Sequence, residues 1–127
     1  MYCLKLYRAA GLAKIVMAGD VLEDEMLAIG RDLERTLLTE PGTVAGLLID
    51  LQQAKPPTAN VSTILRELEE RTFETTTVRI AELVESELIA GQLGRVAEST
   101  SGGERLKHFW QLEPALAWLA EPDGDAS

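Results

Sequence analysis

The chain contains one cysteine and one histidine among its 127 residues, and acidic residues outnumber basic ones. A single cysteine, Cys3, excludes a disulfide within this chain and cannot build a metal cluster by itself. The 12 basic and 21 acidic residues give a net charge of −9, which argues against nucleic-acid binding and against simple electrostatic docking on anionic lipid. No apolar run approaches membrane-spanning length. We therefore expect a cytoplasmic protein with no transmembrane segment.

The length and the composition predict one folded domain. With 46% hydrophobic and 26% charged residues, the balance is that of an ordinary soluble protein. A domain of this length buries roughly two thirds of its unfolded surface, so it needs neither disulfide nor metal to fold. We assign residues 1–120 to a single domain and residues 121–127 to a polar C-terminal tail.

The most apolar stretch organises the predicted fold. Leu47, Leu48 and Ile49 are consecutive, which is typical of a central strand buried on both faces. We predict that this strand ends near Asp50 and that a proline-broken loop, residues 52–60, follows it. Sites in open α/β sheets lie at the carboxyl ends of such strands, so this loop is the predicted location of any site.

Apolar periodicity predicts the remaining elements in alternation. We expect strands at 2–7 and 12–18 joined as a hairpin, a helix from Asp20 to a stop at residues 40–42, and a helix starting near residues 58–60. A half-exposed strand at 75–84, a helix capped by Ser86, a strand at 105–112 and a helix opened by Pro114 complete the order. This alternation implies a mostly parallel sheet.

The helix patterns also predict which side chains are buried. In the first helix, Asp20 is the expected cap, with Glu23 as its capping-box partner, and five residues at helical spacing form the inner stripe: Leu22, Met26, Ile29, Leu33 and Leu37. In the second helix, the charged group of Glu67, Glu69, Glu70 and Arg71 is assigned to solvent. In the third helix, the apolar residues are Leu88, Ile89, Leu93 and Val96.

Three segments resemble the SpoIIAA-like proteins of the STAS-like (anti-sigma-factor antagonist) fold. They are residues 19–26 with their strand-end glycine and acidic helix start, residues 47–51 with their apolar-Asp-Leu pattern, and Phe109 followed by residues 115–119 with their Ala-Trp-Leu helix. The resemblance implies an α/β fold in which helices pack on a single layer of mixed, mostly parallel sheet with an opening β-hairpin.

The resemblance departs from the family at one functional position. Anti-sigma-factor antagonists carry a phosphorylatable serine in a turn after the central strand, and here residues 58–61, Thr-Ala-Asn-Val, occupy that turn. The resemblance thus implies a regulatory or protein-interaction module that lacks this serine. Other SpoIIAA-like proteins are suspected of binding apolar ligands or of associating reversibly with membranes, which gives the alternative function.

The candidate site consists of Asp50, Thr58, Asn60 and Ser62. At a helix amino terminus these hydroxyl and amide groups suit an anion or a partner protein, whereas the structural alternative is simple helix capping. Asp50 either holds a cation or the loop, or accepts backbone hydrogen bonds in the turn; one carboxylate alone makes no metal site.

No pattern in the sequence indicates catalysis. His108 has no companion at metal-ligand spacing and no identifiable nucleophile, so we interpret it as a packed or partly exposed strand residue. Cys3 is interpreted as a buried, inert thiol. We expect a non-enzymatic protein with no cofactor, no metal and no nucleic-acid partner. We also expect a homodimer, because apolar stripes on short helices often pair across a two-fold axis.

Overall fold

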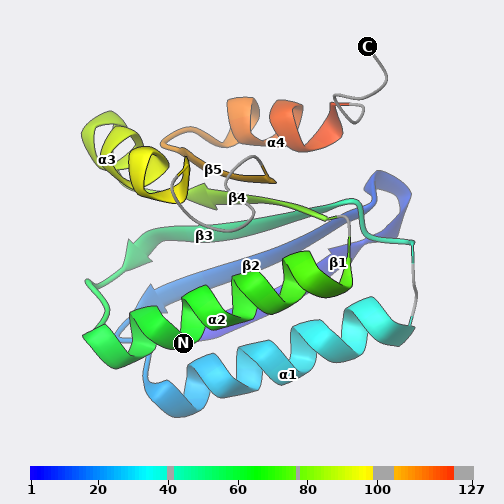
Figure 1. Cartoon of the computed structure of the whole chain (residues 1–127), viewed down its shortest axis with the longest axis horizontal. Helices are drawn as coiled ribbons and strands as arrows, with labels where there is room; N and C mark the ends of the chain where they lie inside the picture. Colours follow the sequence, from blue (N-terminus) through cyan, green and yellow to red (C-terminus); the bar gives the residue numbers. More distant parts are fainter. Residues whose placement is uncertain (40–41, 77, 99–104, 122–127) are drawn as a thin grey trace.

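The computed structural model describes residues 1–39, 42–76, 78–98 and 105–121, and these form one sheet with helices packed on it (Figure 1). The strands are β1 (Tyr2–Tyr7), β2 (Leu12–Gly19), β3 (Gly46–Ala54), β4 (Arg79–Leu83) and β5 (Leu106–Phe109). The helices are α1 (Glu23–Thr39), α2 (Ala59–Thr75), α3 (Glu87–Glu98) and α4 (Leu112–Ala120), and a short 3-10 turn, η1 (Arg8–Ala10), joins the first two strands.

The sheet has the predicted mixed character. Its strands follow one another in chain order, β1 runs antiparallel to β2, and β2 to β5 are parallel. The opening hairpin turns at Gly11, whose φ of 63° is a left-handed conformation that favours glycine. The predicted order of strands and helices and the predicted central strand are confirmed, since Leu47, Leu48 and Ile49 are all buried.

Helices cover the two faces of the sheet unequally. Helices α1 and α2 lie side by side over one face, and α4 lies on the other (Figure 1). Alternation along the strands sends Ile15, Ile49 and Ile80 into the larger core under α1 and α2, and Leu48 and Leu83 into the smaller core under α4. Helix α3 packs beside the edge strand β5. The part of the sheet between α2 and α3 is where the candidate site lies.

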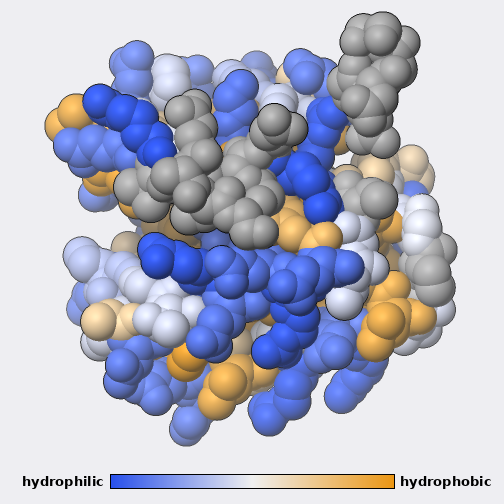
Figure 2. All heavy atoms as spheres, viewed as in Figure 1, coloured by the Kyte–Doolittle hydropathy of each residue, from blue (hydrophilic) through white to orange (hydrophobic). Residues whose placement is uncertain are grey.

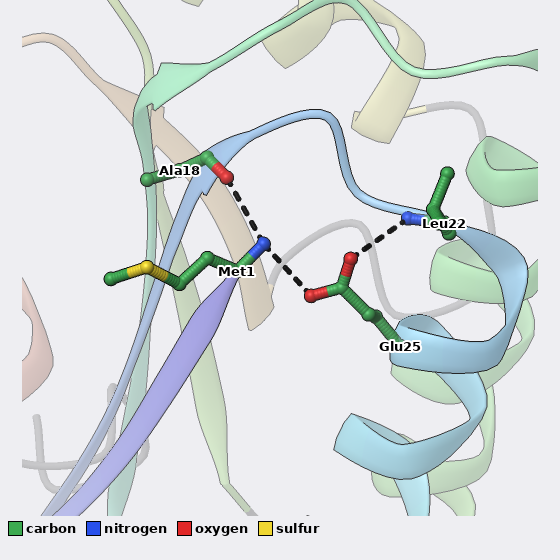
Figure 3. A network of polar contacts seen from close by, with 4 residues as sticks. All are labelled: Met1, Ala18, Leu22 and Glu25. Atoms are coloured by element: carbon green, nitrogen blue, oxygen red, sulfur yellow. Dashed lines mark hydrogen bonds and ion pairs between the residues drawn. The ribbon is translucent and has the colours of Figure 1, made fainter.

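Helix α1 begins later than predicted. Its first residue is Glu23, so Asp20 is not its cap, and Leu22 is 62% exposed instead of buried. Glu25 takes the role that was predicted for Glu23, because its Oε1 accepts from the Leu22 amide at 3.4 Å (Figure 3). Its Oε2 lies 2.8 Å from the Met1 amino group, which also donates to the Ala18 carbonyl at 3.2 Å. These contacts hold the start of α1 against the hairpin.

Several element boundaries and exposures also differ from the prediction. Cys3 is exposed instead of buried, because its side chain alternates to the outer face of β1. Strand β3 continues beyond Asp50 to Ala54, because its last residues still pair with the end of β2. Helix α2 includes Thr75, which had been assigned to the next strand, and β5 is shorter than the predicted 105–112. Strand β4 is buried from Ile80 to Leu83, whereas the prediction was a half-exposed strand. Helices cover its two faces, and β3 and β5 pair with its two edges. Helix α4 begins at Leu112, so Pro114 is its third residue.

Helix α3 keeps its predicted cap, and two of its apolar residues, Ile89 and Leu93, line the cleft described below. The Ser86 hydroxyl accepts from the Ile89 amide at 3.2 Å, as expected for a cap. Leu88, however, is 69% exposed. The predicted stop of α1 at Glu40 and Pro41, and the polar tail apart from Glu121, lie outside the described residues.

Arg105 joins the end of α2 to the start of β4. Its guanidinium donates to the carbonyls of Phe73 at 3.0 Å, Thr76 at 2.6 Å and Val78 at 2.8 Å. It also lies 4.7 Å from the centre of the Phe73 ring, a cation–π distance. The planar guanidinium carries several N–H donors, so it can bind three carbonyl groups of one short segment. These hydrogen bonds fix the end of α2 relative to the start of β4, beside the candidate site.

Candidate functional site

A cleft of about 580 Å³ opens between α2, α3 and the sheet. Its walls are largely apolar, and residues from five different segments contribute to them: Met17, Leu51, Val61, Leu65, Ile89 and Leu106. Hydrophilic side chains predominate over the visible outer face of the molecule, with apolar groups between them (Figure 2). The cleft therefore has an apolar interior in a molecule whose visible face is mostly hydrophilic.

Three ionisable side chains form a buried polar cluster in the wall of this cleft. Glu69 comes from α2, Glu82 from β4 and His108 from β5. Glu69 is 6% exposed, Glu82 is 5% exposed, and the His108 side chain is 5% exposed. Glu82 and His108 are register partners on neighbouring parallel strands, so their side chains leave the sheet on the same face. The His108 Nε2 atom lies 2.9 Å from Glu82 Oε2.

The two carboxyl groups differ in acidity. Burial, together with the hydrogen bond and the charge of Glu82, raises the pKa of Glu69 well above its ordinary value. Burial acts in the same direction on Glu82, but hydrogen bonds from Glu69 and His108 outweigh it and lower the pKa of that carboxyl. If both groups were ionised, Glu69 Oε2 would be buried with no donor. A proton on Glu69 lets the neutral carboxyl donate to Glu82, with which it shares a side-chain hydrogen bond.

The Glu82 carboxylate also holds the His108 ring. Because Glu82 is a carboxylate and accepts only, we assign an imidazole proton to Nε2, which donates to it. The other ring nitrogen, Nδ1, is buried and has no hydrogen-bond partner among the described residues. The cluster therefore combines two hydrogen-bonded carboxyl groups with one ring nitrogen that has no partner in the described part of the chain.

Charged side chains stand at the rim of the cleft. Lys55 and Arg66 supply positive charge there, and Glu70 and Glu85 supply negative charge. Lys55 lies 3.6 Å from Asp20, and both side chains are exposed. The rim thus carries both signs of charge in contact with water, where each charge is strongly screened.

The structure separates the four residues of the predicted site. Asp50 Oδ1 accepts from the Gln52 amide at 3.0 Å, within strand β3, where its pairing with β2 shifts register. Thr58 caps α2 by accepting from the Val61 amide at 3.2 Å, and Asn60 donates to Glu23 Oε1 at 2.9 Å, across to α1.

Only one of those four residues, Ser62, lines the cleft. The predicted loop therefore contributes to the rim of the cleft, and its residues do not gather into one site.

The assignment of Glu69 to solvent was wrong, and the sequence contained a signal for its burial. Glu69 is four residues after Leu65, so it shares the inner face of α2 with that residue. Glu82 likewise stands inside the apolar run of β4. His108 is packed, but sequence reasoning missed its partner, because the pairing depends on β4 and β5 being neighbours in register.

The described residues lack two further features. Across these ranges no three His, Cys, Asp or Glu side chains come together as a metal-ligand group. Within the same part of the chain, every helix is too short or too polar to cross a bilayer.

Comparison with known proteins identifies the fold. No protein-family model matches the chain, and no curated protein matches it. Among solved structures, it is similar to an uncharacterised protein of the DUF3478 family from Shewanella loihica PV-4, which is described as having a SpoIIAA-like fold. The superposition has a TM-score of 0.72 and covers 93% of each chain, at 19% sequence identity. The chain has the SpoIIAA-like fold that its sequence pattern predicted.

Proposed function

We propose that this protein binds a small, largely apolar molecule in the cleft between α2, α3 and the sheet. The observation that carries this proposal is the cleft itself, at about 580 Å³ with mostly apolar walls. Small-molecule sites have volumes of roughly 300–1,000 Å³, apolar linings and a few placed polar groups. The cluster of Glu69, Glu82 and His108 supplies such polar groups in an otherwise apolar wall.

Burial of an alkyl chain supplies the expected driving force. Each methylene transferred from water contributes ~0.8 kcal/mol, which is roughly a fourfold gain in affinity. Affinity for a series of unbranched alcohols should therefore rise by about this factor for each added carbon until the cleft is full. Nile red fluorescence, with displacement by each alcohol, measures this slope.

A matched pair of variants locates the binding site. Ala54 lines the cleft, whereas Ala120 is exposed at the end of α4 on the other face of the sheet. Ala54→Trp fills the cleft and should abolish saturable Nile red binding, and Ala120→Trp should leave it unchanged. Thermal melting is the control that tests whether both variants are folded. Absence of saturable binding by the unmodified protein, or equal binding by the two variants, contradicts the proposal.

The other functional expectations from the sequence stay predictions. They are a regulatory or partner-binding role, a homodimer, a cytoplasmic location, peripheral membrane association and the absence of enzymatic activity. The Thr58 hydroxyl, which stands in the turn where the family carries its phosphorylated serine, accepts a backbone hydrogen bond as the cap of α2. That engagement supports ligand binding over a phosphorylation switch as the function to test first.

A further inference from the structure

The outer side of α1 carries four exposed residues in one stripe. They are Leu27, Arg31, Glu34 and Leu38, and their spacing of four, three and four residues places them on one face of the helix. Leu27 is 51% exposed and Leu38 is 65% exposed, at opposite ends of the stripe. On the visible face, apolar groups lie near both ends of α1, with hydrophilic groups between them (Figures 1 and 2). The helix thus exposes two large apolar side chains to water.

The two charged residues of the stripe are available to another molecule. Arg31 and Glu34 are both exposed. Among the described residues, neither of them forms an ion pair or a side-chain hydrogen bond. An outer helix face that combines exposed leucines with unpaired charges of both signs has the composition of a contact surface.

The order of the stripe is complementary to itself. Leu27 and Leu38 lie equally far from the middle of the stripe, and so do Arg31 and Glu34. A second copy of α1 laid antiparallel therefore sets leucine against leucine and arginine against glutamate, which is the pairing that a two-fold axis produces. The spacing of four, three and four residues is also that of a coiled-coil seam. A parallel copy would set like charges against each other, so the charges select the antiparallel arrangement.

A small hollow beside the stripe offers space for a side chain of the second copy. It has a volume of about 50 Å³ and lies between α1 and α2, where Gly30, Leu38, Leu68 and Thr72 are among the residues that line it. In the antiparallel pair, Leu27 of the second copy approaches Leu38 at the edge of this hollow. An apolar side chain that fills such a hollow is typical of the residues that supply most of the binding energy of an interface.

We propose that two copies of this chain associate through their α1 helices, which lie antiparallel across a two-fold axis. Leu27 of each copy contacts Leu38 of the other, and Arg31 of each copy pairs with Glu34 of the other. All four residues lie outside the set that lines the cleft between α2, α3 and the sheet. The inference is therefore independent of the proposed ligand binding, and it assigns a location to the homodimer interface.

The size of α1 sets the expected strength of the association. Its 17 residues correspond to about 25 Å of helix, and one helix pair of this length is at the low end of specific interfaces. We therefore expect a dissociation constant of roughly 1–100 μM. Each chain carries a net charge of −9, so the measurement belongs at about 0.15 M salt, where the overall repulsion between two copies is screened.

Exchange of the two charges tests the pairing directly by sedimentation equilibrium. Arg31→Glu sets acid against acid in both charge pairs, and Glu34→Arg sets base against base, so each variant should weaken association at least about tenfold. The double variant Arg31→Glu with Glu34→Arg restores opposite charges and should recover the original dissociation constant. An equimolar mixture of the two single variants should also associate, because one copy then supplies two acids and the other two bases. Association that is unchanged in the single variants, or not recovered in the double variant and the mixture, overturns the inference.

A matched pair of leucine variants tests the apolar contact. Leu38→Glu should weaken association at least about 100-fold, since it removes an apolar contact at both ends of the helix pair. Leu88→Glu changes a leucine of α3 that is 69% exposed, and it should leave association unchanged. Both replace exposed side chains, and thermal melting tests whether the variants are folded. An unmodified protein that stays monomeric up to about 1 mM, or equal effects of the two leucine variants, contradicts the proposed interface.

Discussion

Replacing Glu69 by glutamine should make the protein more resistant to rising pH. Glutamine imitates the protonated carboxyl: it is neutral, similar in shape and able to donate to Glu82. Glu69 is 6% exposed and faces Glu82, while Arg66 and Glu70 are the other charged groups that act on it. In the unmodified protein, rising pH removes its proton and creates two buried carboxylates in contact. In Glu69→Gln there is no proton to lose.

The size of the effect follows from proton linkage. The pKa of Glu69 is raised in the folded protein, so its proton contributes stability that is fully present below the unfolded pKa and is lost as pH rises through the folded pKa. Within that window the loss for one proton approaches about 1.4 kcal/mol per pH unit. Glu82 behaves oppositely, because its pKa is lowered and its contribution is lost as pH falls. Stability should therefore be greatest between the two titrations.

Urea unfolding at a series of pH values measures this effect. As pH rises above the ordinary pKa of a glutamate, the free energy of unfolding should fall more steeply in the unmodified protein than in Glu69→Gln. Glu67→Gln, at an exposed position of the same helix, is the control and should follow the unmodified protein. Parallel curves for the unmodified protein and Glu69→Gln over that whole rise in pH would refute the proton assignment.

Three further predictions concern the packing that supports the cleft. Leu48→Ala removes a fully buried side chain of β3 and should lower the free energy of unfolding in urea by about 2–5 kcal/mol; a loss below ~1 kcal/mol contradicts its central position. Arg105→Lys keeps the charge but loses the fork that donates to three carbonyls, and should cost about 1–3 kcal/mol in the same assay. Gly46→Ala places a new carbon 3.1 Å from Leu119 and should destabilise the protein by about 1–3 kcal/mol. Gly94→Ala in α3 meets nothing within 4 Å and should stabilise the protein by up to about 1 kcal/mol. Melting temperatures that are both above, or both below, that of the unmodified protein contradict this contrast.

The fold was largely predictable because its signals are local. Three consecutive apolar residues at Leu47–Ile49, the alternation in residues 2–7 and the helical spacing of Met26, Ile29 and Leu33 each report their own environment. The errors occurred where contacts with neighbouring elements determine the local structure. Strand β3 extends to Ala54 because the end of β2 pairs with it, and Leu22 is exposed because α1 begins one residue after it.

The candidate site was less predictable because its residues are distant in the chain. Glu69, Glu82 and His108 belong to three elements that meet only when β4 and β5 pair and α2 packs over the sheet. A glutamate among charged residues of a helix is exposed in most proteins, so local composition pointed to solvent. The predicted residues, in contrast, make local hydrogen bonds. Thr58 caps α2, and Asp50 accepts from the Gln52 amide within β3.

The central claim is that the cleft binds an apolar molecule, and a methyl-resolved NMR titration with octanol tests it most directly. Val61, Leu65 and Ile89 line the cleft, whereas Leu48 and Leu119 lie in the core on the other face of the sheet. The account predicts saturable shifts of the first group with little change in the second. Shifts confined to Leu48 and Leu119, or no saturable shift in the cleft methyl groups, would contradict it.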